Sequence, residues 1–441
     1  MPVLVPMIPR RNFLLGATAL KAWAAKPLAD DYVVLKESRE PELMQVYSPG
    51  LARLDNGRLV ATCDSAVREA REGWARVEGG RYWINEFFTS DDRGRNWTHR
   101  HTVPMMHARP FAAGGSVYVL GHQNDLAISR SADNGATWSP LHKLTEGEVW
   151  HQAPCNVHYS AGLVYLVMER ITDPEFRGWP VSVLAPVVMS APVDADLTKR
   201  ESWVFSNELT FNQAIAKAGA PRMIGVPFFE PGNQVPEAAK DKRSMAPIGW
   251  LETNLVRFTD PDHVWHDPRQ RTLHLWMRAH TGSTNLACVA KAEESEDRSR
   301  IEVMLERAPS GEPMLYVPCP GGHMKFHILW DGESRMFWLL SSQSTDSMTH
   351  PGRLPADRYN LPNNERHRLA LHFSKNCVDW RFAGLVATGG TPRQARHYAS
   401  MVVDGEDLHV LSRSGDHRAA SAHDGNLITF HTVRKFRELV Y

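Results

Sequence analysis

Short apolar and β-branched runs, separated by turn residues, make up most of the chain beyond its N-terminal segment. Runs of this kind between Gly, Pro, Asn-Gly and Asp-Gly turns are typical of strands, whereas the period of an amphipathic helix is scarce. Residues 51–60 show the unit: an apolar run, the turn Asp55-Asn56-Gly57 and a returning run. Comparable runs occupy residues 59–63, 116–120, 163–168, 273–277, 336–340 and 408–411. The pattern predicts an all-β protein.

A short motif recurs on top of this pattern. Residues 90–97 have the form S-x-D-x-G-x-N-W and residues 131–138 the form S-x-D-x-G-x-T-W, while 374–380 and 190–203 hold degenerate copies. In such a turn the Asp and Ser side chains bond the backbone, the Gly takes a conformation that other residues avoid, and the Trp packs between sheets. The motif resembles the Asp-box, or BNR repeat, of sialidases. This resemblance implies a six-bladed β-propeller of sialidase type, in which Asp92 and Asp133 are structural rather than catalytic.

Division of the chain by these units predicts six blades and two long insertions. The blades are expected at residues 42–105, 106–150, 151–213, 245–312, 317–388 and 395–441, so that one propeller spans residues 26–441. Residues 32–37 are expected to add a strand to the last blade and close the ring. Residues 214–244 and 346–365 are expected to form long loops that wall a binding site.

The N-terminal segment has the features of an export signal. Arg10 and Arg11 precede a modest apolar run that continues to Leu20, and Ala22 and Ala24 place small residues where a signal peptidase reads them. Twin arginines before a weak apolar core are typical of a Tat signal, and the run is too short to remain as a membrane span. Residues 1–25 are therefore predicted to be a Tat-type signal peptide, and the protein is expected to be periplasmic or secreted.

Composition argues against several partners and cofactors. Fifty basic and fifty acidic residues give a formal net charge of zero, and no basic stripe indicates nucleic-acid binding. The five cysteines form no C-x-x-C pair, so buried free thiols are expected, with one disulfide as an open alternative. The one tight His-x-His pair, His99 and His101, follows a turn motif and is expected on an outer strand. No metal, no other cofactor and no stable membrane insertion is expected.

Three segments resemble the active-site strands of sialidases. In the fourth blade, Glu252 opens one strand and Arg278 closes the next. Arg366 precedes the strand that leads into the fifth-blade turn motif, with Arg368 as a close competitor, and Tyr398 lies on the first strand of the sixth blade. The resemblance implies that Tyr398 is the nucleophile and Glu252 its base. It also implies that Arg278 and Arg366 bind a substrate carboxylate.

The chemistry of a sialoside explains these residue types. Its anomeric carbon carries a carboxylate, which repels a carboxylate nucleophile, whereas a neutral tyrosine deprotonated by an adjacent glutamate avoids that repulsion. Arginines bind the carboxylate through paired hydrogen bonds. The interpretation is an exported glycoside hydrolase resembling exo-α-sialidases. It acts on a terminal sugar of a glycan, an acidic one if the arginine set is complete.

The first blade departs from the sialidase pattern. Ser48 stands where sialidases place a third arginine. The arginine set is therefore incomplete unless Arg68, Arg109 or Arg396 takes that role.

The acid/base residue is not fixed by the resemblance. Sialidases carry it on the loop after the second strand of the first blade, where this chain has Asp64, Glu69 and Glu72. Asp64 matches a preceding structural acid better than the catalytic one. Histidines that open inner strands offer proton transfer instead, although most histidines in such places are structural. These are His107, His158, His323 and His397.

Structural and functional alternatives stay open. Arg278 suits an ion pair between blades, Glu252 the start of a strand, and Tyr398 packing within an inner strand. A second interpretation is a different carbohydrate-active enzyme on the same fold: another glycosidase, or a lyase that uses His and Tyr for β-elimination at a uronic acid. A third is a non-catalytic glycan-binding propeller, which needs no glutamate buried beside a tyrosine hydroxyl.

Export is predicted to depend on the twin arginines. Replacement of Arg10 and Arg11 by Lys keeps the positive charge but removes the pair that the Tat pathway reads, so precursor is expected to accumulate in the cytoplasm. Cell fractionation with immunoblotting measures the outcome. Mature protein outside the inner membrane at the normal rate would contradict the prediction.

Overall fold

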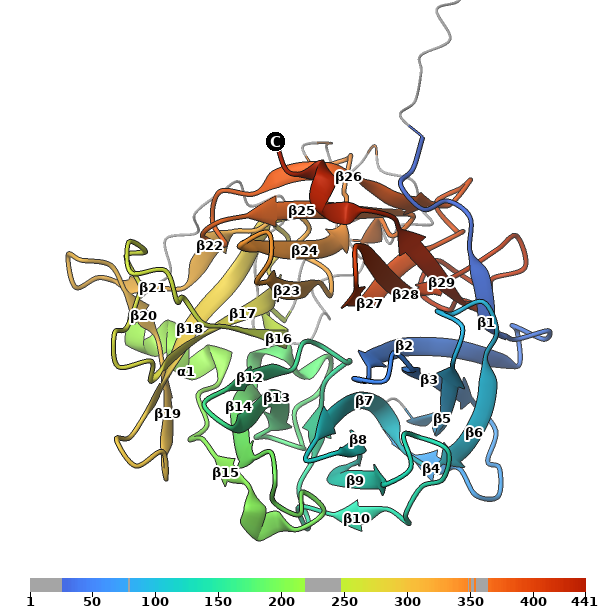
Figure 1. The fold of residues 1–441 in the computed structure, drawn as a ribbon, viewed down its shortest axis with the longest axis horizontal. Coiled ribbons are helices and arrows are strands. Elements are labelled where there is room, and N and C mark those ends of the chain that lie inside the picture. The colour runs from blue at the N-terminus through green and yellow to red at the C-terminus, as the bar shows by residue number, and fades with distance from the viewer. Residues whose placement is uncertain (1–25, 78–79, 219–246, 348, 350–352, 354–363) are drawn as a thin grey trace, which may run out of the picture.

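The inner strands of six antiparallel sheets surround one central axis in the computed structural model of the chain (Figure 1). The structure describes residues 26–77, 80–218, 247–347, 349, 353 and 364–441. Each sheet forms one blade whose strands follow one another from the axis to the rim, so the fold is the predicted six-bladed β-propeller. The predicted signal peptide and most of the two predicted insertions lie outside the described residues.

The first three blades come from residues 44–205. Blade 1 consists of β2 (Met44–Arg53), β3 (Leu59–Val67), β5 (Tyr82–Ser90), β4 (Ala75–Arg76) and β6 (Thr98–Val103). Blade 2 consists of β7 (Met106–Ala113), β8 (Ser116–Gln123), β9 (Asp125–Ser131) and β10 (His142–Lys143). Blade 3 consists of β11 (Trp150–His151), β12 (His158–Ser160), β13 (Leu163–Ile171), β14 (Leu184–Pro192) and β15 (Val204–Phe205). Its inner strand is split, because β11 and β12 both pair with β13.

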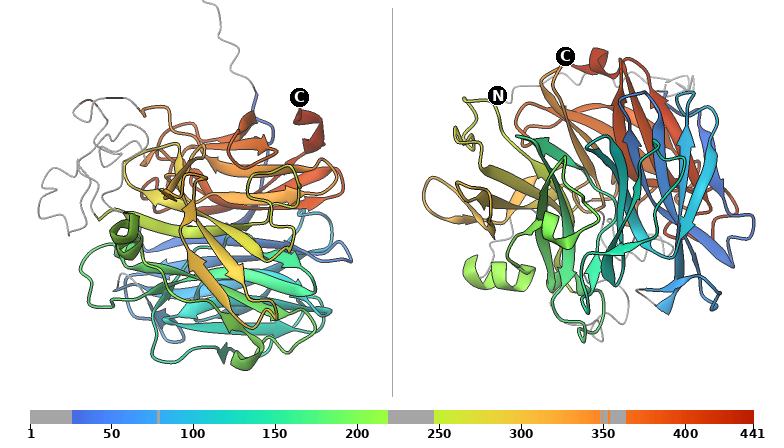
Figure 2. Two further views of the ribbon diagram at one scale, coloured as in Figure 1. Left: turned by 90° about the vertical axis from the view of Figure 1, so that its left-hand side faces the viewer. Right: turned by 60° about the horizontal axis from the view of Figure 1, so that its bottom comes forward.

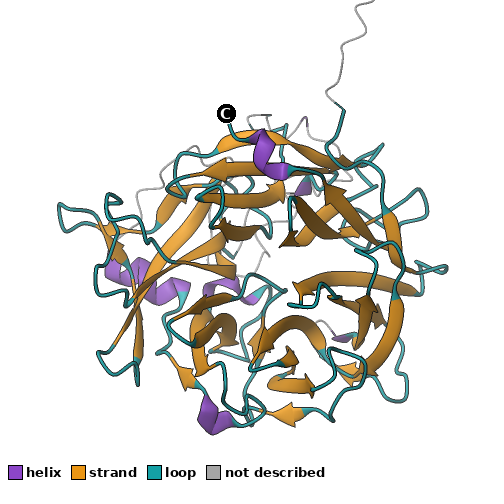
Figure 3. Ribbon diagram, viewed as in Figure 1, coloured by secondary structure: helices purple, strands orange, loops and turns teal. Residues whose placement is uncertain are grey.

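The last three blades begin after the segment that follows the helix α1 (Phe211–Ala218). Blade 4 consists of β16 (Gly249–Val256), β17 (Thr272–His280), β18 (Leu286–Glu294), β19 (Ile301–Met304) and β22 (Tyr316–Pro318). Blade 5 consists of β23 (His327–Asp331), β24 (Met336–Ser342), β25 (Arg368–Ser374) and β26 (Arg381–Thr388). Blade 6 consists of β27 (Arg396–Asp404), β28 (Asp407–Ser414), β29 (Leu427–Val433) and β1 (Val33–Glu37). The hairpin of β20 (Glu306–Arg307) and β21 (Pro313–Met314) is separate from the blades, and Figure 3 shows how little of the molecule is helical.

Strand β1 closes the ring, as predicted for residues 32–37. It pairs antiparallel with β29, so the outermost strand of the last blade comes from the opposite end of the described chain (Figure 1). Closure in this way covers the edge of blade 6 and ties its position to that of blade 1.

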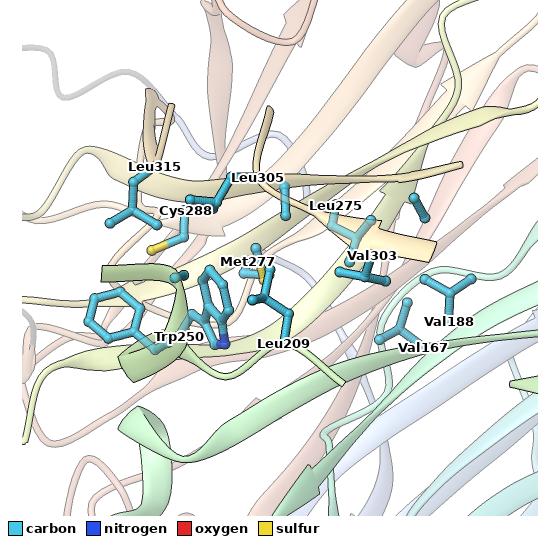
Figure 4. Close-up of a cluster of buried hydrophobic side chains, with 14 of the residues drawn as sticks. Val167, Val188, Leu209, Trp250, Leu275, Met277, Cys288, Val303, Leu305 and Leu315 are labelled. Atoms are coloured by element: carbon cyan, nitrogen blue, oxygen red, sulfur yellow. The ribbon is translucent and has the colours of Figure 1, made fainter. Parts of the chain in front are cut away.

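Apolar side chains fill all six interfaces between neighbouring blades. Because each sheet is covered on both faces, strands such as β3 and β16 are buried along their whole length rather than at alternate residues. Figure 4 shows the cluster between blades 3 and 4, where Val167 and Val188 lie across from Leu275. The same cluster includes α1 at the rim (Figure 2), since Phe211 packs against Trp250 with ring centroids 5.4 Å apart. The interfaces fix the inner strands relative to one another.

The repeated turn motif follows β5 and leads to β6 in blade 1, and it follows β9 and leads to β10 in blade 2. In the first turn the Ser90 hydroxyl accepts a hydrogen bond from the Gly94 amide at 2.9 Å, and the Asp92 carboxylate accepts one from the Asn96 amide at 2.9 Å. The second turn repeats these bonds between its matching residues. The carboxylates of Asp92 and Asp133 therefore hold their own turns, as predicted.

The tryptophan of each motif contacts the preceding blade. Trp97 packs against Phe430 of blade 6 with ring centroids 5.4 Å apart, and Trp138 packs against Phe87 of blade 1 at 4.8 Å. Both tryptophans are half-buried, because the motif lies where solvent reaches one edge of the indole.

Two further predictions concern cysteine and histidine. All five cysteines are buried free thiols. His99 and His101 lie on β6, which pairs only with the outer side of β5 among the described strands, so the outer-strand prediction is confirmed. None of the helices in the described part of the chain has the length and apolar content needed to traverse a lipid bilayer.

Trp138→Ala is expected to destabilise the protein by about 2–4 kcal/mol, because it removes the indole that packs between blades 1 and 2. Trp330→Ala is the matched control, because the Trp330 side chain is 42% exposed. Its replacement is expected to lower the free energy of unfolding by less than about 1 kcal/mol. Urea unfolding followed by fluorescence measures both. Equal losses for the two variants would contradict the structural role of the motif.

Candidate active site

One irregularity recurs on the inner strands of four blades. In β2, β7, β16 and β27, two residues of the inner strand lie opposite one residue of the second strand, which is a β-bulge. The first residue of each bulge has a positive φ although none is glycine. These residues are Ser48 (φ 32°), His107 (φ 57°), Glu252 (φ 60°) and Tyr398 (φ 50°).

The four bulge residues line one cavity of about 260 Å³ near the central axis. A left-handed backbone costs a residue that has a Cβ about 1–2 kcal/mol. Its recurrence at one position in four blades therefore points to a functional site. Other residues of the lining include Tyr47, Arg81, Trp83, His151, Arg413 and His423.

Buried acids on the second strands support two of the bulges. Asp64 Oδ1 accepts hydrogen bonds from the backbone N–H of His107 at 2.9 Å and from Asn85 at 2.7 Å. Glu169 Oε1 accepts from the amide of Thr253 at 3.0 Å and from its hydroxyl at 2.9 Å. Burial raises the pKa of Asp64 to about 8 and that of Glu169 to about 7. In both cases the acid lies in one blade and the bulge in the next, so the support also couples neighbouring blades.

Tyr398, Glu252 and Arg278 meet in the wall of the cavity. Arg278 Nη1 donates to the Tyr398 hydroxyl at 2.7 Å and lies 3.3 Å from Glu252 Oε2, while its Nε donates to the His323 carbonyl at 2.8 Å. Burial raises the pKa of Tyr398 to about 12; the charge of Glu252 and a hydrogen bond to its carboxylate also raise this pKa, and the nearby arginines lower it. The phenol is thus protonated at neutral pH and lies beside a carboxylate that can take its proton.

Arg366 reaches the same region from blade 5. Its Nη1 donates to Nδ1 of His397 at 3.3 Å, and burial lowers its pKa to about 10 while the nearby Tyr398 acts in the opposite direction. The competing Arg368 instead pairs with Glu365. The structure therefore places Arg366, and not Arg368, beside the tyrosine.

A third arginine, Arg413, was missed by the sequence interpretation. Its guanidinium carbon lies 4.2 Å from the centroid of the Tyr47 ring and 5.2 Å from that of Tyr398. Arg413 occupies the same register position in blade 6 as Arg278 in blade 4, opposite the residue that precedes the bulge. It lines the cavity together with Ser48, the small residue found where a third arginine was expected.

None of the three arginines considered as substitutes lines this cavity. Arg68 is exposed. Arg109 donates to two backbone carbonyls of blade 3, at 3.1 and 3.4 Å, and lines a separate cavity of about 460 Å³ further along the inner strands. Arg396 donates to two carbonyls near its own strand, at 2.7 and 2.9 Å.

The carboxyl groups considered for the acid/base role do not line the cavity either. Glu69 and Glu72 are exposed, and Asp64 is fully buried behind the bulge of the next blade. Sequence position on a loop does not reveal the direction in which that loop leaves the blade.

Histidines line the cavity instead. Burial lowers the pKa of His107 well below its usual range, so its ring is neutral at neutral pH, and the exposed His423 lines the cavity from blade 6. His151 lines the cavity beside His107, whereas His158 and His323 lie outside the lining. Ring nitrogens of His107, His122 and His151 lie within 4.8 Å of one another, a spacing at which they can hold a metal ion.

Positive charge dominates the surroundings of the cavity. The cationic side chains are Arg81, Lys325, Arg278, Arg366 and Arg413. Burial lowers the pKa of Lys325 to about 8, which leaves the amine largely charged at neutral pH. Such a site favours an anionic ligand.

Asp64→Asn is expected to change the free energy of unfolding by less than about 1 kcal/mol, because a neutral amide oxygen still accepts both hydrogen bonds. Asp64→Ala leaves two buried donors unpaired and is expected to cost about 2–4 kcal/mol. Urea unfolding at neutral pH measures both variants. An Asn variant as unstable as the Ala variant would show that an ionised carboxylate is required.

Comparison with known proteins identifies the fold. No protein-family model matches the chain, and no curated protein matches it in sequence. A Dyadobacter fermentans protein of unknown function aligns with a TM-score of 0.51 and 12% identity, over 91% of this chain and 97% of that one. The Hadza microbial sialidase Hz136 aligns with a TM-score of 0.51 and 13% identity, over 91% of this chain and 68% of that one. The chain thus has the six-bladed β-propeller fold of sialidase type.

Proposed function

We propose that the protein is an exported exo-glycosidase resembling exo-α-sialidases, which releases a terminal acidic sugar from a glycan with Tyr398 as nucleophile and Glu252 as its base. The observation that carries the proposal is the contact of the Tyr398 hydroxyl with Arg278 and Glu252 in the wall of one cavity. Burial of a carboxylate beside a phenol is unfavourable, because the carboxylate loses its hydration. A glycan-binding module does not require this arrangement. A nucleophile and its base, by contrast, must be in contact.

The reaction follows from this contact. The Tyr398 oxygen attacks the anomeric carbon while Glu252 takes the phenolic proton, and the glycosidic bond breaks with its electron pair on the leaving oxygen, which is protonated from solvent in the cavity. Water then attacks the same carbon and gives up one proton to solvent, and the tyrosine leaves, with Glu252 returning the proton to the phenolic oxygen. Two displacements retain the anomeric configuration.

The substrate class follows from the arginines. Arg278, Arg366 and Arg413 approach Tyr398 from blades 4, 5 and 6. Guanidinium groups bind carboxylates through paired, charge-assisted hydrogen bonds, which strengthen where water is excluded. We assign Arg413 as the third ligand of the substrate carboxylate, in the role that Ser48 cannot fill.

A uronic-acid lyase is the second candidate, and the neutral histidines favour it. His107 and His151 line the cavity beside Tyr398, and burial keeps His107 in the form that accepts a proton. In β-elimination a neutral imidazole removes the proton next to the carboxylate, and a phenol protonates the leaving oxygen. The product distinguishes the candidates: a lyase forms an unsaturated uronate with ultraviolet absorbance, whereas the hydrolase releases a saturated sugar with retained configuration.

Tyr398→Phe is expected to lower kcat/KM by several orders of magnitude while the free energy of unfolding changes by about 1 kcal/mol, because it removes the nucleophilic oxygen but keeps the ring. Glu252→Gln is expected to lower kcat/KM similarly, and the double variant only slightly further, because the two groups act together. The assay uses the best substrate from a panel of sialyl, uronyl and neutral aryl glycosides. Proton NMR of the product follows its configuration.

Tyr47→Phe is the matched control for this experiment. Tyr47 lines the same cavity, but its hydroxyl donates to Asp424 at 2.6 Å. Its variant is expected to keep kcat/KM within about tenfold. Near-normal turnover by Tyr398→Phe would exclude the tyrosine nucleophile. Glycan binding without cleavage of any substrate would indicate a binding module.

A further inference from the structure

Three buried histidines form a cluster that the proposed hydrolysis does not require. His107, His122 and His151 are 6%, 0% and 3% exposed. One ring nitrogen of each lies within 4.8 Å of the others. Their ring centroids are 5.0 to 6.3 Å apart, and His107 and His151 meet nearly edge to face, at 85°.

The propeller, and not a local sequence motif, assembles this cluster. His107 is the bulge residue of β7, His122 lies opposite Met106 on β8, and His151 lies opposite Glu169 at the end of β11 in the next blade. The three rings thus come from three strands in two blades. Their separation in sequence matches no metal-binding motif, so only the strand register brings them together.

The spacing of two nitrogens fits a shared ion better than a direct hydrogen bond. Nδ1 of His107 and Nε2 of His122 are 3.5 Å apart. In a direct hydrogen bond from an N–H group, the donor and acceptor atoms typically lie about 3.0 Å apart. Two nitrogen ligands of tetrahedral zinc, each about 2.0–2.1 Å from the metal, lie about 3.3–3.4 Å from one another. The observed distance requires little movement to accept an ion.

The surroundings also suit metal ligands. Burial excludes competing water from the three rings, and imidazole is the commonest protein ligand of transition metals. Glu169 lies directly opposite His151 on the neighbouring strand β13. Carboxylates in this place orient the ligating histidines of many metal sites. The hydrogen bond from the His107 amide to Asp64, at 2.9 Å, fixes the bulge that carries the first ring.

We propose that His107, His122 and His151 bind a divalent transition-metal ion, with zinc the ion that best suits three imidazoles and one open position. His107 and His151 line the cavity that also contains Glu252 and Tyr398. The open position therefore faces a bound glycan, and a carboxylate or hydroxyl oxygen of the sugar is its fourth ligand. This site goes beyond the proposed glycosidase, which needs no metal, and its test does not rely on turnover.

Metal content of the purified, intact protein tests the site. After removal of metals with a chelator, the protein is equilibrated with Zn²⁺ alone, desalted and measured by inductively coupled plasma mass spectrometry. About one zinc per chain is expected, together with a higher thermal midpoint, because an ion that binds only the native state stabilises it. Replacement by Co²⁺ is expected to give the visible absorption bands of a four-coordinate site.

His122→Gln and His151→Gln are each expected to lower zinc affinity by more than about 100-fold, since each removes one ligand. His423→Gln is the matched control, because His423 lines the same cavity outside the cluster and should leave one zinc bound. A cooperative thermal unfolding transition of each metal-free variant is the check that the variant is folded. The zinc content of the wild type tests the proposal independently of the variants. Wild-type protein that retains no stoichiometric zinc and shows no cobalt bands would overturn the proposal. Equal zinc retention by the wild type and both cluster variants would also overturn it.

Discussion

The site depends on a left-handed residue at the same point of four inner strands. A β-bulge there turns one side chain from the pleat of the blade toward the axis, and the ring of blades brings Glu252, His107 and Tyr398 to one cavity. No non-glycine residue adopts this backbone without cost, so the surrounding structure must hold it. Buried acids of neighbouring blades and the apolar clusters at the six interfaces supply that support. Ring closure by β1 prevents the interfaces from opening.

Burial then determines the chemistry of the groups that the bulges present. Burial raises the pKa of the Tyr398 phenol to about 12 and lowers that of the His107 ring, so both groups are neutral at neutral pH. The arginines keep their charge under the same conditions. They surround a tyrosine that becomes a phenolate when a nearby base takes its proton. A neutral phenol, a buried carboxylate and a cationic wall together suit the proposed substrate, which carries its charge next to the reacting carbon.

Local signals predicted the fold, whereas part of the site depends on pairing that no local signal reveals. The six blades were predicted from turn motifs and apolar runs, because both are patterns of residues close together in the sequence. Tyr398, Glu252, Arg278 and Arg366 were found from strands that resemble those of sialidases, and they lie together. Arg413 and His122 were missed, because their importance arises from lying opposite a bulge, and the position of a bulge depends on strand register.

The acid/base prediction shows the same limit for loops. Glu69 and Glu72 were chosen from their position after the second strand, but the structure leaves both exposed and outside the cavity lining. A loop that leaves a blade is free to take several directions, and its direction is set by contacts with the neighbouring blade. His151, by contrast, reaches the cavity because the inner strand of blade 3 is split at that point.

Covalent trapping tests the central claim, that a bulge presents Tyr398 as a nucleophile, most directly. A fluorinated glycosyl fluoride of the preferred acidic sugar slows the second displacement and lets the glycosyl-enzyme accumulate. Intact mass spectrometry followed by peptide mapping locates the added sugar. The expected result is one glycosyl group per chain on the tyrosine oxygen of the peptide that contains Tyr398, and none in Tyr398→Phe. A label on another residue, or turnover of the natural substrate with no label at all, would contradict the proposed role of the bulge.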